Sequence, residues 1–155
     1  MPTLDFYRNL KVLKKFDGRH AKSITLVERG IIKKTYGKEH HDIFNNEVSV
    51  LKRLKTCKFT PKILAIDNER LTIYMSYCGR TVTNIEKYRA TIDKYKKILE
   101  KKYKIYHNDL RDGNVCIYKH QLYFIDFGWA RPYKGEAGYG AGKLGNSKSS
   151  SLSFN

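Results

Sequence analysis

The stretch that most constrains the fold of this chain is a polar segment at residues 107–115, which reads HNDLRDGNV. The preceding residues 84–103 predict one amphipathic helix, because apolar side chains recur at steps of three and four at Ile85, Tyr88, Ile92, Tyr95 and Leu99. The following residues 115–118 and 122–125 predict a β-hairpin that ends at a further aspartate, Asp126. Polar loops between regular elements are common positions for functional groups, so this segment is a candidate functional loop in an α+β protein.

The N-terminal half combines β-strand and helix patterns. Residues 23–36 predict a hairpin that turns at Gly30, and residues 71–77 predict another strand. Residues 42–54 have helical periodicity, with Asp42 as the N-cap or a first-turn residue. Glu47 falls inside the apolar arc of this helix, where a lone carboxylate is costly. We therefore expect Glu47 to have a cationic partner.

Composition limits the number of domains and the kinds of partner. A length of 155 residues with 41% hydrophobic residues suits one domain or two small lobes that share an interface. The 31 lysines and arginines exceed the 15 aspartates and glutamates, which gives a formal charge of +16. Such a charge favours nucleic acid or another anionic surface as a partner, although it also promotes solubility.

Cysteine usage and hydropathy argue against several other classes. The three cysteines lie far apart and form no CxxC pair, so we expect reduced thiols and neither a disulfide framework nor a zinc site. The chain has no run of about 18 apolar residues, so we expect neither a membrane span nor a signal peptide. We predict a soluble, cytoplasmic protein.

Two sequence motifs indicate a function for the polar segment. His107, Asp109 and Asn114 have the spacing H-x-D-x-x-x-x-N, and Asp126 begins the sequence Asp-Phe-Gly after the short hairpin. The order and spacing resemble those of the catalytic and metal-binding segments of protein kinases. This resemblance implies an α+β, truncated two-lobed protein kinase-like fold. A structural alternative remains, because aspartate and asparagine also cap helices and form turns.

The resemblance also implies a division of the chain. A small β-rich N-lobe with one helix would span residues 1–78, and a reduced C-lobe with the catalytic and metal-binding loops would span residues 79–131. Residues 132–155 are rich in glycine, serine and lysine and are expected to form a flexible tail.

Phosphoryl transfer requires in-line positioning and neutralisation of phosphate charge, which Mg²⁺ held by carboxylate and carbonyl oxygens provides. The resemblance implies that Asn114 and Asp126 hold the Mg²⁺ of a bound ATP. It further implies that Asp109 accepts or orients the proton of an attacking hydroxyl and that Arg111 stabilises the transferring phosphate.

A lysine on the third strand of a kinase pairs with a glutamate on the next helix and contacts the ATP phosphates. Here the resemblance implies Lys33 and Glu47, with Lys34 as the competing choice, because neighbouring strand residues face opposite sides. Met75 would occupy the gatekeeper position, and the backbone from Ser76 to Cys78 would contact the adenine edge.

The sequence departs from the kinase pattern in three places. Residues 16–23 offer only Gly18 where kinases have a glycine-rich phosphate loop, and Asn108 replaces the usual arginine before Asp109. Only 27 residues follow Gly128, without the A-P-E segment or the helices that bind peptide substrates. The chain therefore looks more like reduced kinases: the RIO type, the small kinase of the KEOPS complex, and minimal kinases of large DNA viruses.

The function that this resemblance implies is a minimal ATP-dependent serine/threonine protein kinase acting on a protein substrate. A viral chain of this kind would act in the host cytoplasm or the virion. One alternative is a kinase-derived structural or binding subunit of a virion or nucleoprotein assembly. Another is an ATPase in an RNA-modifying complex.

Overall fold

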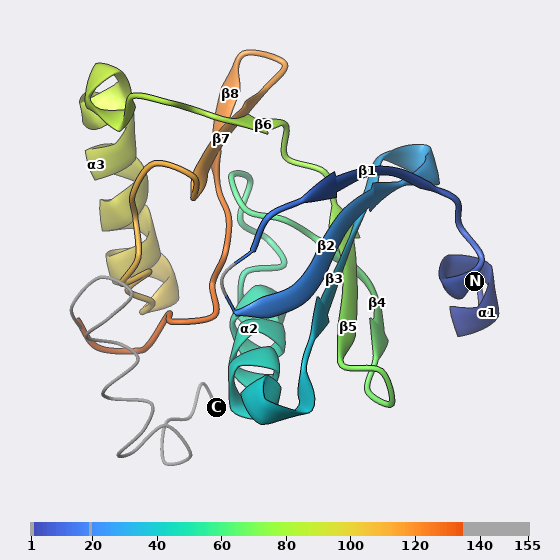
Figure 1. Cartoon of the computed structure of the whole chain (residues 1–155). Coiled ribbons are helices and arrows are strands. Elements are labelled where there is room, and N and C mark those ends of the chain that lie inside the picture. Colours follow the sequence, from blue (N-terminus) through green and yellow to red (C-terminus); the bar gives the residue numbers. More distant parts are fainter. Residues whose placement is uncertain (1, 19, 135–155) are drawn as a thin grey trace.

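The computed structural model describes residues 2–18 and 20–134 of the chain, and it shows an α+β fold built around two antiparallel sheets (Figure 1). The larger sheet has the strand order β1-β2-β3-β5-β4. Its strands are β1 (Val12–Phe16), β2 (Ala21–Val27), β3 (Ile31–Tyr36), β4 (Ile63–Asp67) and β5 (Thr72–Ser76). The smaller sheet contains β6 (Arg80–Thr81), β7 (Val115–Tyr118) and β8 (Gln121–Phe124). The α+β class expected from the sequence is confirmed.

The hairpin predicted over residues 23–36 is formed by β2 and β3, which pair from Val27 and Ile31 onwards. Arg29 and Gly30 in the connecting 3₁₀ turn both have positive φ angles, of 70° and 68°. Glycine adopts this conformation at little cost, which explains why the chain reverses direction here.

Helix α2 (His41–Arg53) matches the helix predicted over residues 42–54 to within one residue at each end. Asp42 lies in its first turn, and His40 occupies the N-cap position. The apolar side of α2 is buried against the core, and Glu47 on that side is only 1% exposed. A carboxylate so deeply buried requires compensating partners, which the site provides.

The long helix predicted over residues 84–103 is present but is not uniform. A 3₁₀ turn at Ile85–Tyr88 leads into α3 (Arg89–Ile98), and a π-helical turn at Leu99–Tyr103 ends it. Lys104, with φ of 59°, stops the helix in the left-handed conformation. Phe59 and Tyr95 stack with ring centroids 4.0 Å apart, and this contact packs α3 against the segment that follows α2.

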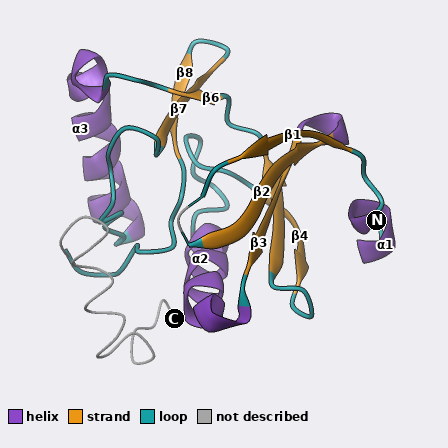
Figure 2. Cartoon of the chain, viewed as in Figure 1, coloured by secondary structure: helices purple, strands orange, loops and turns teal. Residues whose placement is uncertain are grey.

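Side chains from both sheets share one hydrophobic core. Phe44 and Ile73 from the side of the larger sheet belong to the same buried cluster as Leu99, Phe124 and Phe127. Figure 2 shows α2 beside the larger sheet and α3 beside the smaller one. Loop segments run between α2 and α3. The polar segment at residues 107–114 is held by neighbouring segments: the Ile85 N–H donates to Asp112, and His107 lies 2.7 Å from the Ile125 carbonyl oxygen.

A second, smaller cluster covers the other face of the larger sheet. Helix α1 (Leu4–Arg8) packs Tyr7 against Tyr74, with ring centroids 5.1 Å apart. Arg8 donates a hydrogen bond of 2.7 Å to the buried Asp67 at the end of β4. The N-terminal residues thus cover a sheet face that would otherwise expose apolar side chains.

Four sequence-based expectations concern membrane spans, the cysteines, the division into lobes and the C-terminal tail. No helix among the described residues is long and apolar enough to cross a membrane. Cys57, Cys78 and Cys116 are buried free thiols, as expected. The division into lobes between residues 78 and 79 stays a prediction, and the tail expected at residues 132–155 lies, beyond residue 134, outside the described part of the chain.

Candidate active site

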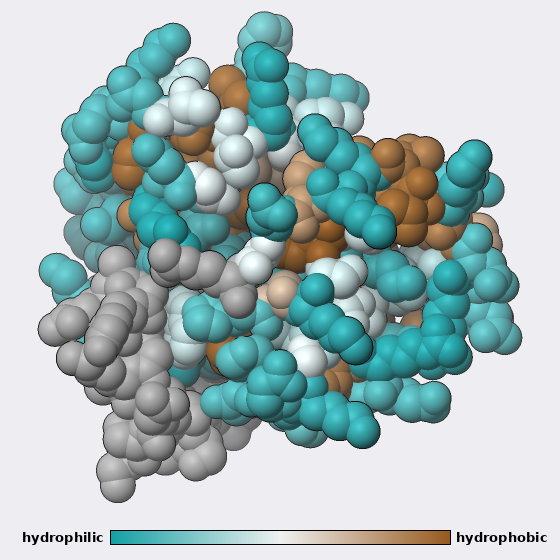
Figure 3. All heavy atoms as spheres, in the orientation of Figure 1, coloured by the Kyte–Doolittle hydropathy of each residue, from teal (hydrophilic) through white to brown (hydrophobic). Residues whose placement is uncertain are grey.

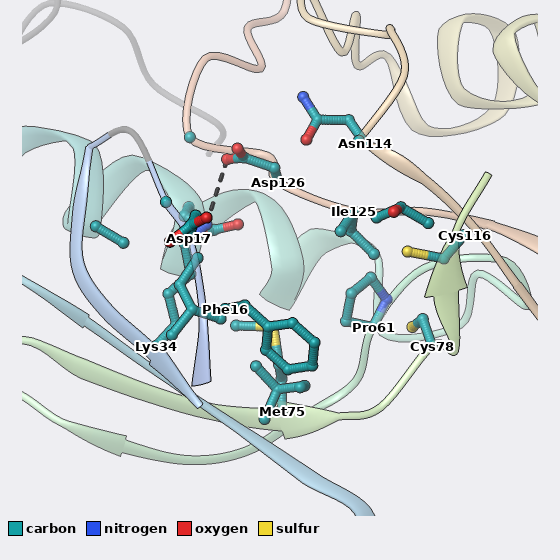
Figure 4. A pocket seen from close by; sticks show the side chains of 18 of the residues that line it. Phe16, Asp17, Lys34, Pro61, Met75, Cys78, Asn114, Cys116, Ile125 and Asp126 are labelled. Carbon is teal, nitrogen blue, oxygen red and sulfur yellow. Dashed lines mark hydrogen bonds and ion pairs between the residues drawn. The ribbon is translucent and has the colours of Figure 1, made fainter. Parts of the chain in front are cut away.

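A cavity of about 650 Å³ lies between the larger sheet and the polar segments of the second half of the chain. Figure 4 shows Lys34 and Asp126 at one end of it, and Pro61, Cys78 and Cys116 at the other. We call residues 107–114 and 125–128 the floor of the cavity. We call the β1–β2 connection, described at residues 16–18 and at His20, its roof. The volume is within the range of small-molecule sites in proteins.

A buried ionic cluster occupies one end of the cavity. The Lys34 Nζ lies 2.9 Å from Glu47 Oε1 and 3.3 Å from Asp126 Oδ1. The Tyr36 hydroxyl donates a hydrogen bond of 2.5 Å to Glu47 Oε1, and the backbone N–H of Phe127 donates one of 2.9 Å to Glu47 Oε2. The Glu47 carboxylate therefore joins β3, α2 and the segment after Asp126, which compensates for its burial.

The predicted pairing of Lys33 with Glu47 is wrong, and the competing choice, Lys34, forms the pair. Lys33 points to the opposite face of β3, where its Nζ lies 6.0 Å from the centre of the Tyr74 ring. Adjacent strand residues face opposite sides of a sheet, and the side that faces α2 depends on the sheet packing. Residue type alone does not encode that choice.

The charges in this cluster shift the titration of its members. Burial alone would lower the pKa of Lys34, but the negative charges of Asp126 and Glu47 outweigh it and hold that pKa well above its usual value. Burial alone would raise the pKa of Asp126, but the positive charge of Lys34 counters it and the pKa is lowered. Burial and the neighbouring Glu47 raise the pKa of Tyr36. At neutral pH Lys34 and Asp126 are charged, while Tyr36 keeps its proton and remains a donor.

The floor is ordered around His107, which is buried. Its Nε2 lies 2.7 Å from the carbonyl oxygen of Ile125, and its Nδ1 lies 3.1 Å from the backbone nitrogen of Asp109. The Asp109 N–H must donate to Nδ1, so Nε2 carries the ring proton and donates to Ile125. Burial lowers the pKa of His107 and favours this neutral form, against the opposing effects of the Ile125 carbonyl and of nearby carboxylates.

Arg111 and Asn114, two of the residues predicted from the sequence, both contact the side chain of Asp109, which is 4% exposed. Arg111 Nε donates a hydrogen bond of 3.0 Å to Asp109 Oδ1. Asn114 Nδ2 donates to the Asp109 carbonyl at 2.9 Å and to Asp109 Oδ2 at 3.2 Å. These contacts fix the orientation of the Asp109 carboxylate.

Two floor residues adopt left-handed backbone conformations that are uncommon outside glycine. Asn108 has φ of 68° and Asp126 has φ of 63°. The Asn108 side chain donates to the carbonyl oxygens of Trp129 and Tyr133, at 3.2 and 3.3 Å. Strained backbone of this kind persists where the surroundings impose it, and it concentrates at functional sites.

The oxygens that face the cavity fit a hard divalent cation. Both Asn114 and Asp126 line the cavity, and the Asp126 side chain is 38% exposed. Asn114 uses its nitrogen in the two bonds to Asp109, which leaves Oδ1 without a hydrogen-bond partner among the described residues. One carboxylate and one amide oxygen suit Mg²⁺, which keeps several waters and takes few protein ligands. No group of three or more His, Cys, Asp or Glu side chains suited to a metal occurs in the described residues.

The other end of the cavity is apolar. Met75, Ser76 and Cys78 line it, as expected for the strand that leads out of the larger sheet. Burial raises the pKa of both Cys78 and Cys116 to about 12, so these thiols keep their protons. Gly79 has φ of 92°, and a side chain there would meet the Ile117 carbonyl oxygen at 1.9 Å, so only glycine allows the chain to pass β7 so closely.

The roof contacts the floor through aromatic rings. The His20 ring lies edge-on to Trp129, with centroids 5.0 Å apart and planes at 90°, and 5.4 Å from the His40 ring. Trp129 directly follows Gly128 of the Asp-Phe-Gly segment, so this contact links the roof to the end of the floor.

Sequence reasoning missed three residues of the site. Tyr36 could have been found, because it lies two positions after Lys34 and therefore on the same strand face. Asn46 donates hydrogen bonds of 2.9 Å to the carbonyl oxygens of Gly128 and Ala130, and the helical periodicity of residues 42–54 does not indicate these partners. The contact of His20 with Trp129 joins distant parts of the chain and leaves no local signal.

No protein-family model matches the sequence, and no curated protein is similar to it. Among solved structures, the fold is similar to that of the Cydia pomonella granulovirus kinase PK-1, with a TM-score of 0.66 and 17% sequence identity. The match covers 83% of this chain and 57% of the viral kinase, so the chain spans little more than half of that protein's length. The chain has a truncated protein kinase-like fold. The likeness is to a viral kinase, and it does not single out the RIO type or the KEOPS kinase.

Proposed function

We propose that this chain is a minimal ATP-dependent phosphotransferase of the serine/threonine protein kinase type. The observation that carries the proposal is the cluster of Lys34, Glu47 and Asp126 at the end of a cavity that also contains Asn114. A buried lysine paired with two carboxylates contributes little net stability compared with apolar residues, so its presence supports a functional role beside its structural one.

The shape of the cavity supports one orientation of ATP. The apolar end, with Met75 and the backbone from Ser76 to Cys78, suits the adenine ring. The phosphates would then extend towards Lys34, which takes the phosphate-contacting role that the sequence analysis gave to Lys33. Lys34 is held by Glu47 and stays charged, which suits it to contact phosphate oxygens.

Asn114 Oδ1 and the Asp126 carboxylate are the groups that would hold Mg²⁺ beside the phosphates. Bound Mg²⁺ neutralises phosphate charge and orients the terminal phosphate. Asp126 also contacts Lys34, so the charges that would surround the phosphates are fixed relative to one another before any ligand binds. Fixed charges of this kind stabilise a transition state without reorganisation.

Asp109, which Arg111 and Asn114 connect to the lining of the cavity, is the residue that would act on the attacking hydroxyl. As the hydroxyl oxygen bonds to the γ-phosphorus and the bond to the departing ADP oxygen breaks, Asp109 accepts the hydroxyl proton. Arg111, whose side chain is 44% exposed, contacts Asp109 and reaches solvent at the cavity, where it can contact the transferred phosphate.

The test separates ATP binding from phosphate transfer. We expect Mg²⁺-dependent ATP binding to the wild-type protein in calorimetry, weakened at least about 100-fold by Asp126→Asn, because a metal ligand and a charge are lost. Asp93→Asn on the exposed side of α3 makes the same charge change away from the cavity and should bind as the wild type does. Asp109→Asn should keep ATP binding and lose transfer of labelled phosphate to casein.

Two outcomes would overturn the proposal. If the wild-type protein binds no ATP with Mg²⁺ present, the alternative of a kinase-derived structural subunit is favoured, consistent with a roof that has only Gly18. If ATP is hydrolysed on addition of RNA but no phosphoprotein forms, the chain is an ATPase rather than a protein kinase.

A further inference from the structure

A large share of the positive charge gathers where the end of α2 meets the C-terminal half of α3. Residues 52–58 and 94–104 contain ten lysines and arginines but only one acidic residue, Glu100. The two segments are joined by the Phe59–Tyr95 stack and by a hydrogen bond of 2.8 Å from Arg53 Nε to the Tyr103 carbonyl. We define the basic face by the exposed side chains of Lys52, Lys55, Lys58, Lys94, Lys101 and Lys102.

The lysines of this face are chain neighbours of the residues that join the two segments. Lys94 precedes Tyr95 in α3, and Lys101 and Lys102 precede Tyr103 in the π-helical turn that follows it. Tyr95 stacks on Phe59, which follows Lys58, and the Tyr103 carbonyl accepts the hydrogen bond from Arg53, which follows Lys52. Figure 3 shows hydrophilic side chains over the outer side of α3, at the left of the view.

The fold does not neutralise this charge. Among the described residues, none of the six lysines of the basic face forms an ion pair with a carboxylate. Like charges held together on one surface repel and lower the stability of the folded state, so the arrangement costs the protein stability. An external polyanion would relieve that repulsion.

The lack of large exposed apolar side chains among the described residues of the basic face limits the kinds of partner that it can bind. The large hydrophobic side chains that are exposed in the described structure are Val12, Leu13, Leu64 and Tyr118, none of which belongs to the basic face. Stable protein interfaces need an apolar or aromatic centre and are poor in lysine, and helices that insert into membranes need an apolar side. A nucleic acid backbone needs only cations that reach its phosphates.

We propose that the basic face, where no described residue exposes an aromatic ring on which the bases of a single strand could stack, binds the phosphate backbone of double-stranded nucleic acid without sequence preference. No residue of the basic face lines the cavity, so nucleic acid and a cavity ligand can bind at the same time. The inference does not depend on the proposed kinase activity, and a failure of one leaves the other standing.

The test compares two triple variants with the same change in charge. Lys58, Lys101 and Lys102 are replaced by Gln in the first variant. Lys11, Lys15 and Lys22, exposed on and beside β1 and β2, are replaced by Gln in the second. Binding of a short fluorescent DNA duplex is followed by anisotropy between about 50 and 200 mM salt. We expect the first variant to bind at least about tenfold more weakly at 0.1 M salt, with the slope of log affinity against log salt reduced by about three.

Thermal unfolding is the control for this test, and two outcomes would overturn the proposal. The first variant should unfold at the same or a higher temperature, because it relieves repulsion, so lost binding would not reflect lost folding. Equal weakening by the second variant would show that only net charge matters and would overturn the proposal. So would wild-type binding to phosphatidylserine vesicles but not to duplex DNA or RNA, because the face would then recognise an anionic membrane.

Discussion

The floor and the roof of the cavity are held by different kinds of contact. In the floor, His107, Asp109 and Asn114 are joined by hydrogen bonds of 2.9 to 3.2 Å, and Glu47 accepts a hydrogen bond from the N–H of Phe127. In the roof, the His20 ring packs edge-to-face on Trp129, next to the end of the floor. The comparison indicates that hydrogen bonds and ion pairs fix the charged groups of the floor, whereas aromatic packing contributes to the position of the roof.

The largest expected effect comes from breaking the ionic cluster on which the floor depends. Lys34→Met would leave the carboxylate of Glu47 buried without its cation, and we expect a loss of about 3–5 kcal/mol in the free energy of unfolding. Urea unfolding measures this loss. ATP binding with Mg²⁺ should fall below detection, because the phosphates lose their lysine.

Lys33→Met is the matched control, because it removes the same charge from the neighbouring position on the other face of β3. It should change the free energy of unfolding by less than about 1 kcal/mol and leave ATP binding intact. If the two variants behaved alike, the assignment of Lys34 would be wrong, and the ionic cluster would no longer distinguish the floor from the roof.

The floor was the more predictable of the two regions, because its motif is local in the chain. The spacing of His107, Asp109 and Asn114 is read directly from the sequence. The position of Glu47 in an apolar helix face predicted a cationic partner, since buried charge needs compensation. Sequence also identified the amphipathic helices, although the π-helical end of the second one followed from packing and not from periodicity.

Contacts between distant segments could not be predicted in the same way. The choice between Lys33 and Lys34 depends on which face of β3 meets α2, and that is decided by the packing of the whole sheet. The partners of Asn46, the carbonyl oxygens of Gly128 and Ala130, are more than 80 positions away in the chain, so no local pattern predicts them. Helical periodicity describes one element and does not identify the segment that packs against it.

A smaller effect is expected from protonating His107 in the floor. Burial lowers its pKa in the folded protein, so the unfolded chain takes up a proton first as the pH falls below the ordinary value of about 6.5. The contribution of neutral His107 to the free energy of unfolding is fully present above that pH. It is lost as the pH falls towards the folded pKa, and the free energy of unfolding then decreases by up to about 1.4 kcal/mol per pH unit. Urea unfolding at a series of pH values between about 7.5 and 5.5 measures the slope.

Replacing the titrating group separates His107 from the other histidines. His107→Asn should flatten the dependence of the free energy of unfolding on pH. His120→Asn, at an exposed turn position with φ of 68°, should leave the slope unchanged. An unchanged slope in the His107 variant would mean that the floor accepts a charged imidazole, contrary to the neutral form fixed by the Asp109 N–H.

The smallest expected effect concerns the roof. His20→Ala removes the ring contact with Trp129, and we expect a loss of about 0.5–1.5 kcal/mol in the free energy of unfolding. Affinity for ATP should fall only a few-fold, because one ring contact of the roof is lost while the charged groups keep their places. Trp129 is the single tryptophan of the chain, so its fluorescence reports this contact directly.

His20→Phe restores an aromatic edge at the same position, and it should recover the fluorescence and most of the affinity if ring packing holds the roof. If His20→Phe lost as much ATP affinity as His20→Ala, ring packing would not explain the position of the roof. The imidazole nitrogens of His20 would then be the groups that hold it. If His20→Ala weakened ATP binding as much as Lys34→Met, the roof would be as necessary as the ionic cluster. A chain with only Gly18 in its roof would then have replaced the flexibility of a glycine-rich loop with one specific contact between His20 and Trp129.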